Sequence, residues 1–461
     1  MKRALLLEFA EFAASVMRGK LDEAICHHAK RAIIDYVACA IAGWDEAPMP
    51  MLRAALSHEM DPLVPHASKT LLGEPCSPRT AALLQGTAAH VVEFDDIFKD
   101  AIFHPGAPTI SAALAIAAMQ HDKGSDLLRA TIAGYEISTR IGVAMGRNHY
   151  RFWHNTGTIG SFGAATAAAA MLKTDAGHLQ QALAIVTSFA AGLQQAFRSD
   201  SHSKPLHAGR AAEAGVLAAL AAQQGVTGSA DVLDGEAGFG LAMSGSPDGS
   251  AVDWSMATDG LGSRWNIASM TFKNHGCCGH SFAAIDAALA LKTRAALQGD
   301  QVLEHVAGIE VHTYAEALAV ANIQDPRTAA EAKFSMRYVI AHALLWGAVR
   351  LDAVSDTRLQ DPHIRALMKR IEVKEDPQIS AVFPKQRAAR VRLRLHDGTS
   401  FEHFQPTRIG DPDARLSDEA LGDKFLELCR ANLGEEGARA ALQSLWHLEH
   451  SKDFILLRRS G

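Results

Sequence analysis

The sequence predicts a mainly α protein with a large all-α helical domain built from both chain ends and a smaller α+β domain inserted between them. Three observations support this fold class. The chain has 461 residues, too many for one compact core. Helical periodicity runs from the N-terminus to about residue 270 and returns after about residue 417. Between these segments, alternation of apolar and polar residues predicts strands.

The N-terminal part predicts closely packed helices. The first stretch, MKRALLLEFAEFAASV, predicts an amphipathic helix and not a signal peptide, because Glu8 and Glu11 interrupt its apolar run. In DEAICHHAKRAIIDYVACAIAG the apolar residues recur with helical spacing, and Gly43 is placed to end the helix. The segment 209–225 presents Ala or Gly at every turn, which permits close contact between helices.

The inserted domain is predicted at 273–405, and the helical domain at 1–272 and 406–461. Strands are expected at 305–314 and at 388–404, the latter folded around the turn Asp397-Gly398. An amphipathic helix is expected at 330–347. The tail returns to helix at 417–434, which opens on the capping signal Ser417, Asp418 and Glu419.

Composition excludes several classes of function. The formal net charge of −6 and a pI near 6.4 give no electrostatic reason to expect nucleic acid as a partner. The longest uncharged runs are rich in Gly, Ala and Ser, so no membrane segment is predicted. Six cysteines are too few for a disulfide scaffold, and a reducing cytoplasm is the expected location.

Three predicted helix starts carry a basic side chain. His104 stands before the helix of FHPGAPTISAALAIAAM, His154 before that of HNTGTIGSFGAATAAAAML, and Lys204 before an alanine-rich helix. Free N–H groups and the positive end of a helix dipole attract anions, and small residues beside them let a ligand approach the backbone. Together they predict a site for a small polyanion with a transferable proton, although each residue alone could be a simple cap.

An acidic run, HVVEFDDIF, precedes His104. Glu93 and Asp96 are three residues apart and are expected on one helix face, whereas Asp95 points elsewhere. No metal is expected, because these carboxylates and a distant histidine match no compact ligand spacing.

The adjacent cysteines 277 and 278 are too few for an iron–sulfur cluster. Phosphate-loop, dinucleotide and serine-hydrolase motifs do not occur in the sequence.

The junction between the predicted domains, TFKNHGCCGHSFAAIDAAL, concentrates polar side chains. Lys273, His275, Cys278 and His280 crowd it, and an apolar helix follows. Domain junctions are preferred places for ligand clefts. The alternative is a polar hinge that contains buried cysteines.

At this point the motifs resemble those of the MmgE/PrpD family over nearly the whole chain. They occur in the family's order: HVVEFDDIF with HPGAPTISAALAIA, GYEISTRIG, WHNTGTIGSFGAATAAAAML, SHSKPLHAGRAAEAG, FKNHGCCGHSFAAIDAAL, AKFSMRYVIAHALLWG and GDPDARLSDEALGDKF. The resemblance implies an all-α domain, an inserted α+β lid, a homodimer and chemistry without a cofactor.

Three positions depart from the family pattern: Glu93 replaces an Asp, Ile97 replaces a small hydroxyl residue and Asn155 replaces a proline. At the junction, Gly276 replaces a proline and His280 is displaced by two positions.

The resemblance also implies a lyase or isomerase that acts on a small di- or tricarboxylate next to a carboxylate group. Dehydration of the 2-methylcitrate type is the first expectation, with iminodisuccinate-type epimerisation and cis-aconitate-type decarboxylation as alternatives. A non-catalytic small-anion binding protein is a further one. The expected catalytic residues are His104 and His154 for proton exchange, Lys204 and Lys273 for carboxylates, and Glu93 or Asp96 for orientation or protonation. The expected substrate-binding residues are Asp95, Thr156, Thr158, His275, Cys278 and His280.

Overall fold

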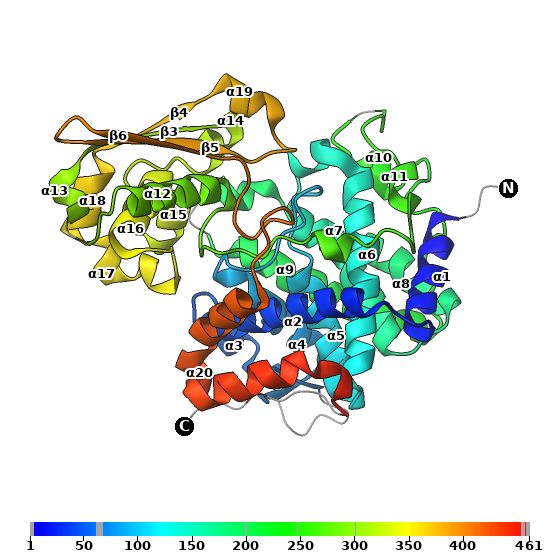
Figure 1. Cartoon of the computed structure of the whole chain (residues 1–461). Helices are drawn as coiled ribbons and strands as arrows, with labels where there is room; N and C mark the ends of the chain where they lie inside the picture. The colour runs from blue at the N-terminus through cyan, green and yellow to red at the C-terminus, as the bar shows by residue number, and fades with distance from the viewer. Residues whose placement is uncertain are drawn as a thin grey trace. The chain divides into compact units, whose positions relative to one another are not determined.

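The computed structural model describes residues 4–60, 68–198, 201–246, 248–299, 301–452 and 457. The chain forms two compact units, Met1–Thr271 with Ser417–Gly461 and Phe272–Leu416 (Figure 1). The protein is mainly helical, with 60% helix and 9% strand. No helix among the described residues has the length and apolar character needed to cross a membrane.

The second unit extends eleven residues beyond the predicted end at 405, to Leu416. Hydrogen bonds within the unit account for the difference. The Ile409 N–H donates to Asp286 Oδ2 (2.8 Å), and the Phe272 N–H donates to the Gly410 carbonyl (3.0 Å). The prediction that 406–416 belong to the helical domain was therefore wrong, because these bonds tie the segment to the start of the second unit.

The first unit is a set of packed helices with one short strand pair. Its helix α7 is buried at every residue, and α5, α6, α8 and α9 pack around it. Small side chains allow this packing: a Cβ on Gly215 of α9 would lie 2.5 Å from the Cβ of Ala164 in α7. The elements are α1 Leu5–Arg18, α2 Glu23–Gly43, α3 Met49–Ala55, β1 Ser68–Lys69, β2 Pro75–Cys76, α4 Pro78–Val91, α5 Gly106–Gln120, α6 Gly124–Tyr150, α7 Asn155–Met171, α8 Ala176–Thr187, α9 Ser203–Gln223, α10 Phe239–Met243, α11 Ser255–Thr258 and α20 Asp418–Trp446.

The C-terminal helix α20 packs against α2 of the same unit. It begins where the capping signal predicted, since the Ser417 side chain accepts the Ala420 N–H (3.1 Å). Buried Lys424 donates to Asp35 Oδ1 and to the Phe94 carbonyl, both at 2.6 Å. The tail therefore helps to hold the loop that follows α4, which carries the acidic run.

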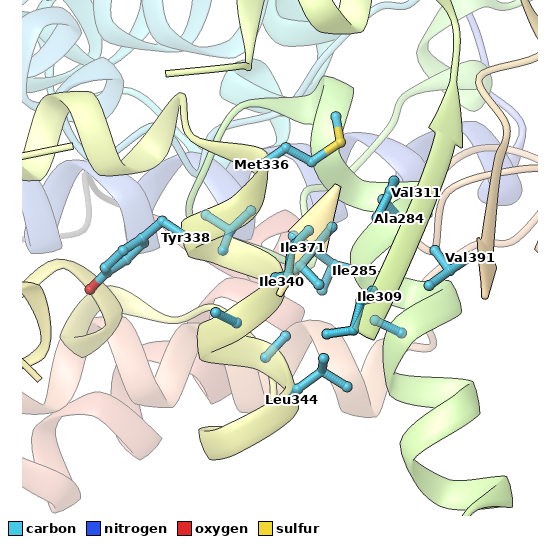
Figure 2. Close-up of a cluster of buried hydrophobic side chains, with 14 of the residues drawn as sticks. Ala284, Ile285, Ile309, Val311, Met336, Tyr338, Ile340, Leu344, Ile371 and Val391 are labelled. Carbon is cyan, nitrogen blue, oxygen red and sulfur yellow. The ribbon is translucent and has the colours of Figure 1, made fainter. Parts of the chain in front are cut away.

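The second unit is an α+β structure around a four-stranded sheet. The strand order is β4-β3-β5-β6, with β3 and β4 parallel and the other neighbours antiparallel. Figure 2 shows Ile285 of α12 and Ile340 of α16 in one apolar cluster with Ile309 and Val391 of the sheet. The elements are α12 Phe282–Arg294, α13 Gln301–His305, β3 Val306–Thr313, α14 Ala315–Val320, α15 Ala329–Lys333, α16 Met336–Trp346, α17 Asp356–Leu359, α18 Pro362–Met368, β4 Ile371–Glu375, α19 Pro377–Val382, β5 Ala389–Leu395 and β6 Ser400–Gln405.

Two expectations for this unit had different outcomes. The hairpin around Asp397-Gly398 is confirmed, because β5 and β6 pair antiparallel across it. The single helix expected at 330–347 was wrong, since the chain forms α15 and α16 with a break before Ser335. The Ser335 hydroxyl donates to the Ile323 carbonyl (2.6 Å), and its oxygen caps α16 by accepting the Tyr338 N–H.

A buried histidine in the core of the second unit predicts a stability effect. His342 of α16 is 1% exposed, and neither ring nitrogen has a hydrogen-bond partner among the described residues. Burial lowers its pKa from 6.5 to about 4. The unfolded chain therefore takes up the proton first, so this contribution to stability is complete above pH 6.5 and is lost as the pH falls toward 4.

We expect His342→Leu to raise the free energy of unfolding by about 1–3 kcal/mol at pH 7, because it removes unsatisfied buried polar atoms. The variant should also lose less stability than the wild type between pH 6.5 and 4. Urea unfolding at several pH values measures both effects. His396→Leu, at an exposed position of the same unit, is the control. An unchanged pH slope in His342→Leu would contradict the prediction.

Candidate active site

Three helices of the first unit begin beside the basic residues singled out by the sequence: the predicted starts after His104 and His154 are confirmed, whereas α9 begins at Ser203, one residue before Lys204. His104 lies two residues before α5, His154 is the N-cap residue of α7, and Lys204 lies in the first turn of α9. The His154 side chain makes no capping hydrogen bond. Its imidazole is therefore not used as a simple cap.

The carboxylate of Asp95 lies between two imidazoles. Asp95 Oδ2 accepts a hydrogen bond from His90 Nδ1 at 2.7 Å and lies 3.2 Å from His104 Nδ1. The His90 and His104 rings meet edge to face with centroids 4.7 Å apart. His90 and Asp95 are buried, whereas 15% of the His104 side chain is exposed. His104 is therefore the member of this group that a ligand can reach.

The electrostatics keep Asp95 charged and His90 neutral. Burial alone would raise the pKa of Asp95, but the neighbouring His104 and His90 outweigh it and hold that pKa well below its ordinary value. Burial lowers the pKa of His90 to about 3 despite the carboxylate. A charged Asp95 directs the His104 Nδ1–H toward itself, which leaves Nε2 of His104 as the basic nitrogen.

His154 extends this group toward α9. Its ring stacks on that of His90 with centroids 5.5 Å apart, and the edge of Phe197 lies 4.8 Å away. His154 Nδ1 is 3.1 Å from Nδ1 of His207. Burial, followed by the neighbouring histidines, holds the pKa of His154 well below its ordinary value. The imidazole is therefore neutral near pH 7 and can exchange a proton in either direction.

Lys204 supplies a cation beside the histidines. Its ammonium group pairs with the Glu93 carboxylate and lies 5.1 Å from the centre of the Phe197 ring. Glu93 has a φ of 58°, in the left-handed region, just after α4 ends at Val91. The expectation that Glu93 and Asp96 share a helix face was wrong, because the chain leaves the helix before both residues.

Asp96 points away from Asp95, into the packing of α5 and α6. Its Oδ2 accepts the Tyr135 hydroxyl (2.8 Å), and its Oδ1 accepts the Gly106 N–H at the start of α5 (3.1 Å). Burial, together with the charges of Asp35 and Asp95, raises the pKa of Asp96 to about 7. Asp96 thus differs from Asp95 in both its partners and the direction of its pKa shift, and its contact with Gly106 ties it to the start of α5, two residues after His104.

The hydroxyl residues of α7 serve different neighbours. Thr156 Oγ1 accepts the backbone N–H of His104 (3.2 Å), which joins the starts of α5 and α7. Thr158 Oγ1 instead bonds to Nε2 of His149 (2.8 Å), a buried ring whose pKa falls to about 4 through burial. Asn155 donates from Nδ2 to the Ala101 carbonyl (2.6 Å). Thr156 and Asn155 therefore position the loop that carries His104.

The remaining candidates, Lys273, His275, Cys278 and His280, belong to the second unit. Buried His275 uses both ring nitrogens within that unit: Nε2 lies 3.1 Å from Asp286 Oδ1, and Nδ1 accepts the Val349 N–H (3.3 Å). His280 Nδ1 is bonded to the Tyr314 hydroxyl (2.8 Å). Lys273 and Cys278 are 1% and 7% exposed. Substrate binding by these four residues stays a prediction.

Three residues of the site, His90, Tyr135 and His207, were not predicted from the sequence. His90 lies five residues before Asp95 and looked like part of an apolar helix. Tyr135 lies within the motif GYEISTRIG, where no local feature indicates its contact with Asp96. His207 follows Lys204 by three residues, a spacing that places both on one side of α9. That spacing and the presence of His207 in the motif SHSKPLHAGRAAEAG are the two signals that could have found it.

The geometry of His90, Asp95 and His104 also allows a cation. One nitrogen from each histidine and one Asp95 oxygen lie within 4.8 Å of one another. The spacing of Glu93, Asp95, Asp96 and His104 alone did not indicate a metal site, and His90 completes the set of three possible ligands. We interpret the group as an acid–histidine arrangement, since His90 Nδ1 donates to Asp95 Oδ2 and His104 Nδ1 lies within ion-pair distance of the same oxygen. Activity measured in the presence of a chelator tests this interpretation.

The chain combines a mainly helical fold with a buried acid–histidine group. Two family models match it: the MmgE/PrpD N-terminal domain over residues 7–251 and the MmgE/PrpD C-terminal domain over residues 275–449. The protein therefore belongs to the MmgE/PrpD family, as its motifs predicted.

Curated relatives in this family include enzymes. The chain is 28% identical to a cis-aconitate decarboxylase of Homo sapiens, over 99% of this chain and 94% of the relative. It is 26% identical to that of Mus musculus, over 96% and 90%. It is 25% identical to that of Aspergillus terreus, over 87% and 84%.

Proposed function

We propose that this protein is a lyase that decarboxylates cis-aconitate or a closely similar small tricarboxylate without a bound cofactor. The observation that carries the proposal is the neutral His154 beside the pair of His104 and charged Asp95, at the starts of α5 and α7. The names of the relatives support decarboxylation more than the 2-methylcitrate dehydration that the sequence first favoured.

The proposed reaction needs fixed positive charge and a proton. Breaking the bond to the departing carboxylate releases CO2 and leaves an electron pair on the carbon skeleton. Protonation of a skeleton carbon completes the reaction, so a trianion and one proton give a dianion and CO2. Lys204 and the N–H groups at the helix starts offer the positive charge. His154 and His104 offer the proton-transfer groups.

The Glu93–Lys204 pair adds a condition to substrate binding. Because Lys204 is already paired, an incoming carboxylate competes with Glu93 for the ammonium group. Glu93 is one methylene longer than the aspartate that the family motif carries at this position. In our proposal the longer side chain keeps Lys204 charged and oriented until the substrate arrives. Lys273 remains a predicted second cation, and closure of the second unit as a lid remains part of the proposal.

The experiment is incubation in deuterated water with cis-aconitate, citrate, 2-methylcitrate and iminodisuccinate, followed by proton NMR and CO2 detection. We expect cis-aconitate alone to release CO2 and to give a product with a terminal methylene (=CH2) group and one solvent deuteron. Activity should survive EDTA, because the proposed chemistry uses only side chains and backbone N–H groups.

Other results would replace the proposal. A vinyl signal from citrate or 2-methylcitrate without CO2 would identify a dehydratase, and C–H exchange in iminodisuccinate without loss of a group would identify an epimerase. Tight binding with no turnover of the four compounds would identify an anion-binding protein. Loss of activity in EDTA, restored by a divalent metal, would assign a cation to His90, Asp95 and His104.

A further inference from the structure

We infer that His207 is the residue through which buried His154 takes up protons from solvent. The inference rests on the proposed function, because decarboxylation consumes one proton in each turnover, whereas dehydration and epimerisation consume none overall. His207 acts through His154 and is therefore a positioning and relay residue.

The contact between the two rings is direct. Nδ1 of His154 lies 3.1 Å from Nδ1 of His207, and the ring centroids are 5.3 Å apart with an interplanar angle of 53°. His154 is 2% exposed, whereas His207 is partly exposed. His207 is thus closer to solvent than His154. The hydrogen bond joins a buried proton-transfer group to one in contact with solvent.

Among the described residues, His207 is the protic group that reaches the His154 ring. The other two rings around His154 belong to His90, whose Nδ1–H donates a hydrogen bond to Asp95, and to Phe197, which has no exchangeable proton. Nε2 of His154 has no hydrogen-bond partner in the described part of the chain, and the relay assigns it to the reaction with the substrate. The ring therefore has one nitrogen for the relay and one for chemistry.

Two glycines allow the rings to meet. A Cβ on Gly192 would lie 3.2 Å from Cγ and Nδ1 of His207, and the carbonyl of Gly192 accepts the His154 N–H at 2.8 Å. A Cβ on Gly157, in the first turn of α7, would lie 3.2 Å from Cβ of His207 and 2.3 Å from the Ala191 carbonyl oxygen. The backbone around His154 is thus shaped to fit His207.

The proton balance of the relay is simple. His207 takes a proton from water at Nε2 and passes its Nδ1 proton to Nδ1 of His154. His154 gives its Nε2 proton to the carbon that becomes electron-rich as CO2 leaves. One proton enters from water and one reaches the product, and exchange with water after product release resets the tautomers. Burial and nearby Lys204 lower the pKa of His207, so its protonated form gives up the proton readily.

The test is His207→Ala and His207→Gln, assayed by CO2 release in dilute buffer that contains no imidazole. We expect kcat to fall about 100-fold in both variants with KM for cis-aconitate little changed, because the proton supply and not binding is impaired. Added imidazole should restore His207→Ala in a saturable manner, since the small acid can occupy the space left by the ring. His202→Ala, an exposed histidine five residues earlier, is the control and should match the wild type.

Each other outcome identifies which statement fails. If the wild type releases no CO2, the proposed function fails and the relay falls with it. If the wild type is active and His207→Ala equals His202→Ala, the relay alone is overturned. Full activity in His207→Gln would also overturn it, because glutamine keeps a hydrogen bond but carries no relayed proton. A loss of kcat in His207→Ala that imidazole does not restore would also overturn the relay, because it would assign His207 a structural role.

Discussion

Replacing Asp95 with Asn is expected to lower kcat for the proposed decarboxylation by about three to four orders of magnitude. The charged carboxylate is the common partner of His90 and His104 through a single oxygen, Oδ2. An asparagine of the same shape would carry no charge and would direct an N–H at one of the two imidazoles. His104 would then lose the tautomer that leaves Nε2 basic, as happens when the aspartate of a catalytic triad is changed in this way.

The measurement is kcat and KM for cis-aconitate, with thermal unfolding to verify the fold. The control is Asp100→Asn, an exposed aspartate five residues further along the same loop, which should leave both constants unchanged. KM should rise less than kcat falls, because Asp95 does not carry the positive charge that binds carboxylates. A loss in Asp95→Asn of less than tenfold with the fold intact would remove the acid–histidine group from the mechanism.

The helix starts and the strand hairpin were readable from the sequence because their signals are local. Ser417 with its acidic neighbours caps α20, and Asp397-Gly398 closes the β5–β6 hairpin, both as predicted. The same holds for the helices that begin next to His104 and His154. In each case the deciding residues lie within one turn or loop of the feature. The break between α15 and α16 was missed because it also depends on a contact from Ser335 to Ile323, twelve residues away.

The candidate site was only partly predictable, because its contacts join distant segments. The sequence supplied Asp95, His104 and His154, but the ring of His90 and the carboxylate of Asp95 meet only where the chain turns at Glu93. That turn needs a left-handed φ at a non-glycine residue, which helix periodicity does not indicate. The bond between His154 and His207 spans 53 residues and depends on the close approach of the backbone at Gly192.

Replacing His154 with Gln is expected to lower kcat by two orders of magnitude or more, the effect usual for loss of a general acid or base. Glutamine can still form a hydrogen bond with His207, but it cannot pass a proton from one end of its side chain to the other. The buried imidazole of His154 is neutral, and the amide of glutamine is neutral as well. The substitution should therefore leave the thermal unfolding temperature close to that of the wild type. His202→Gln, at an exposed position of the α9 N-terminus, should change neither property.

The double variant His154→Gln/His207→Ala separates a shared role from two independent ones. If both rings act in one relay, the double variant should be no slower than His154→Gln alone, and imidazole should fail to rescue it. If the two losses multiply, the histidines contribute independently and the relay is wrong. Near-normal turnover of His154→Gln would instead show that His154 only begins α7, and His104 beside Asp95 would then be the remaining candidate for proton transfer in the first unit.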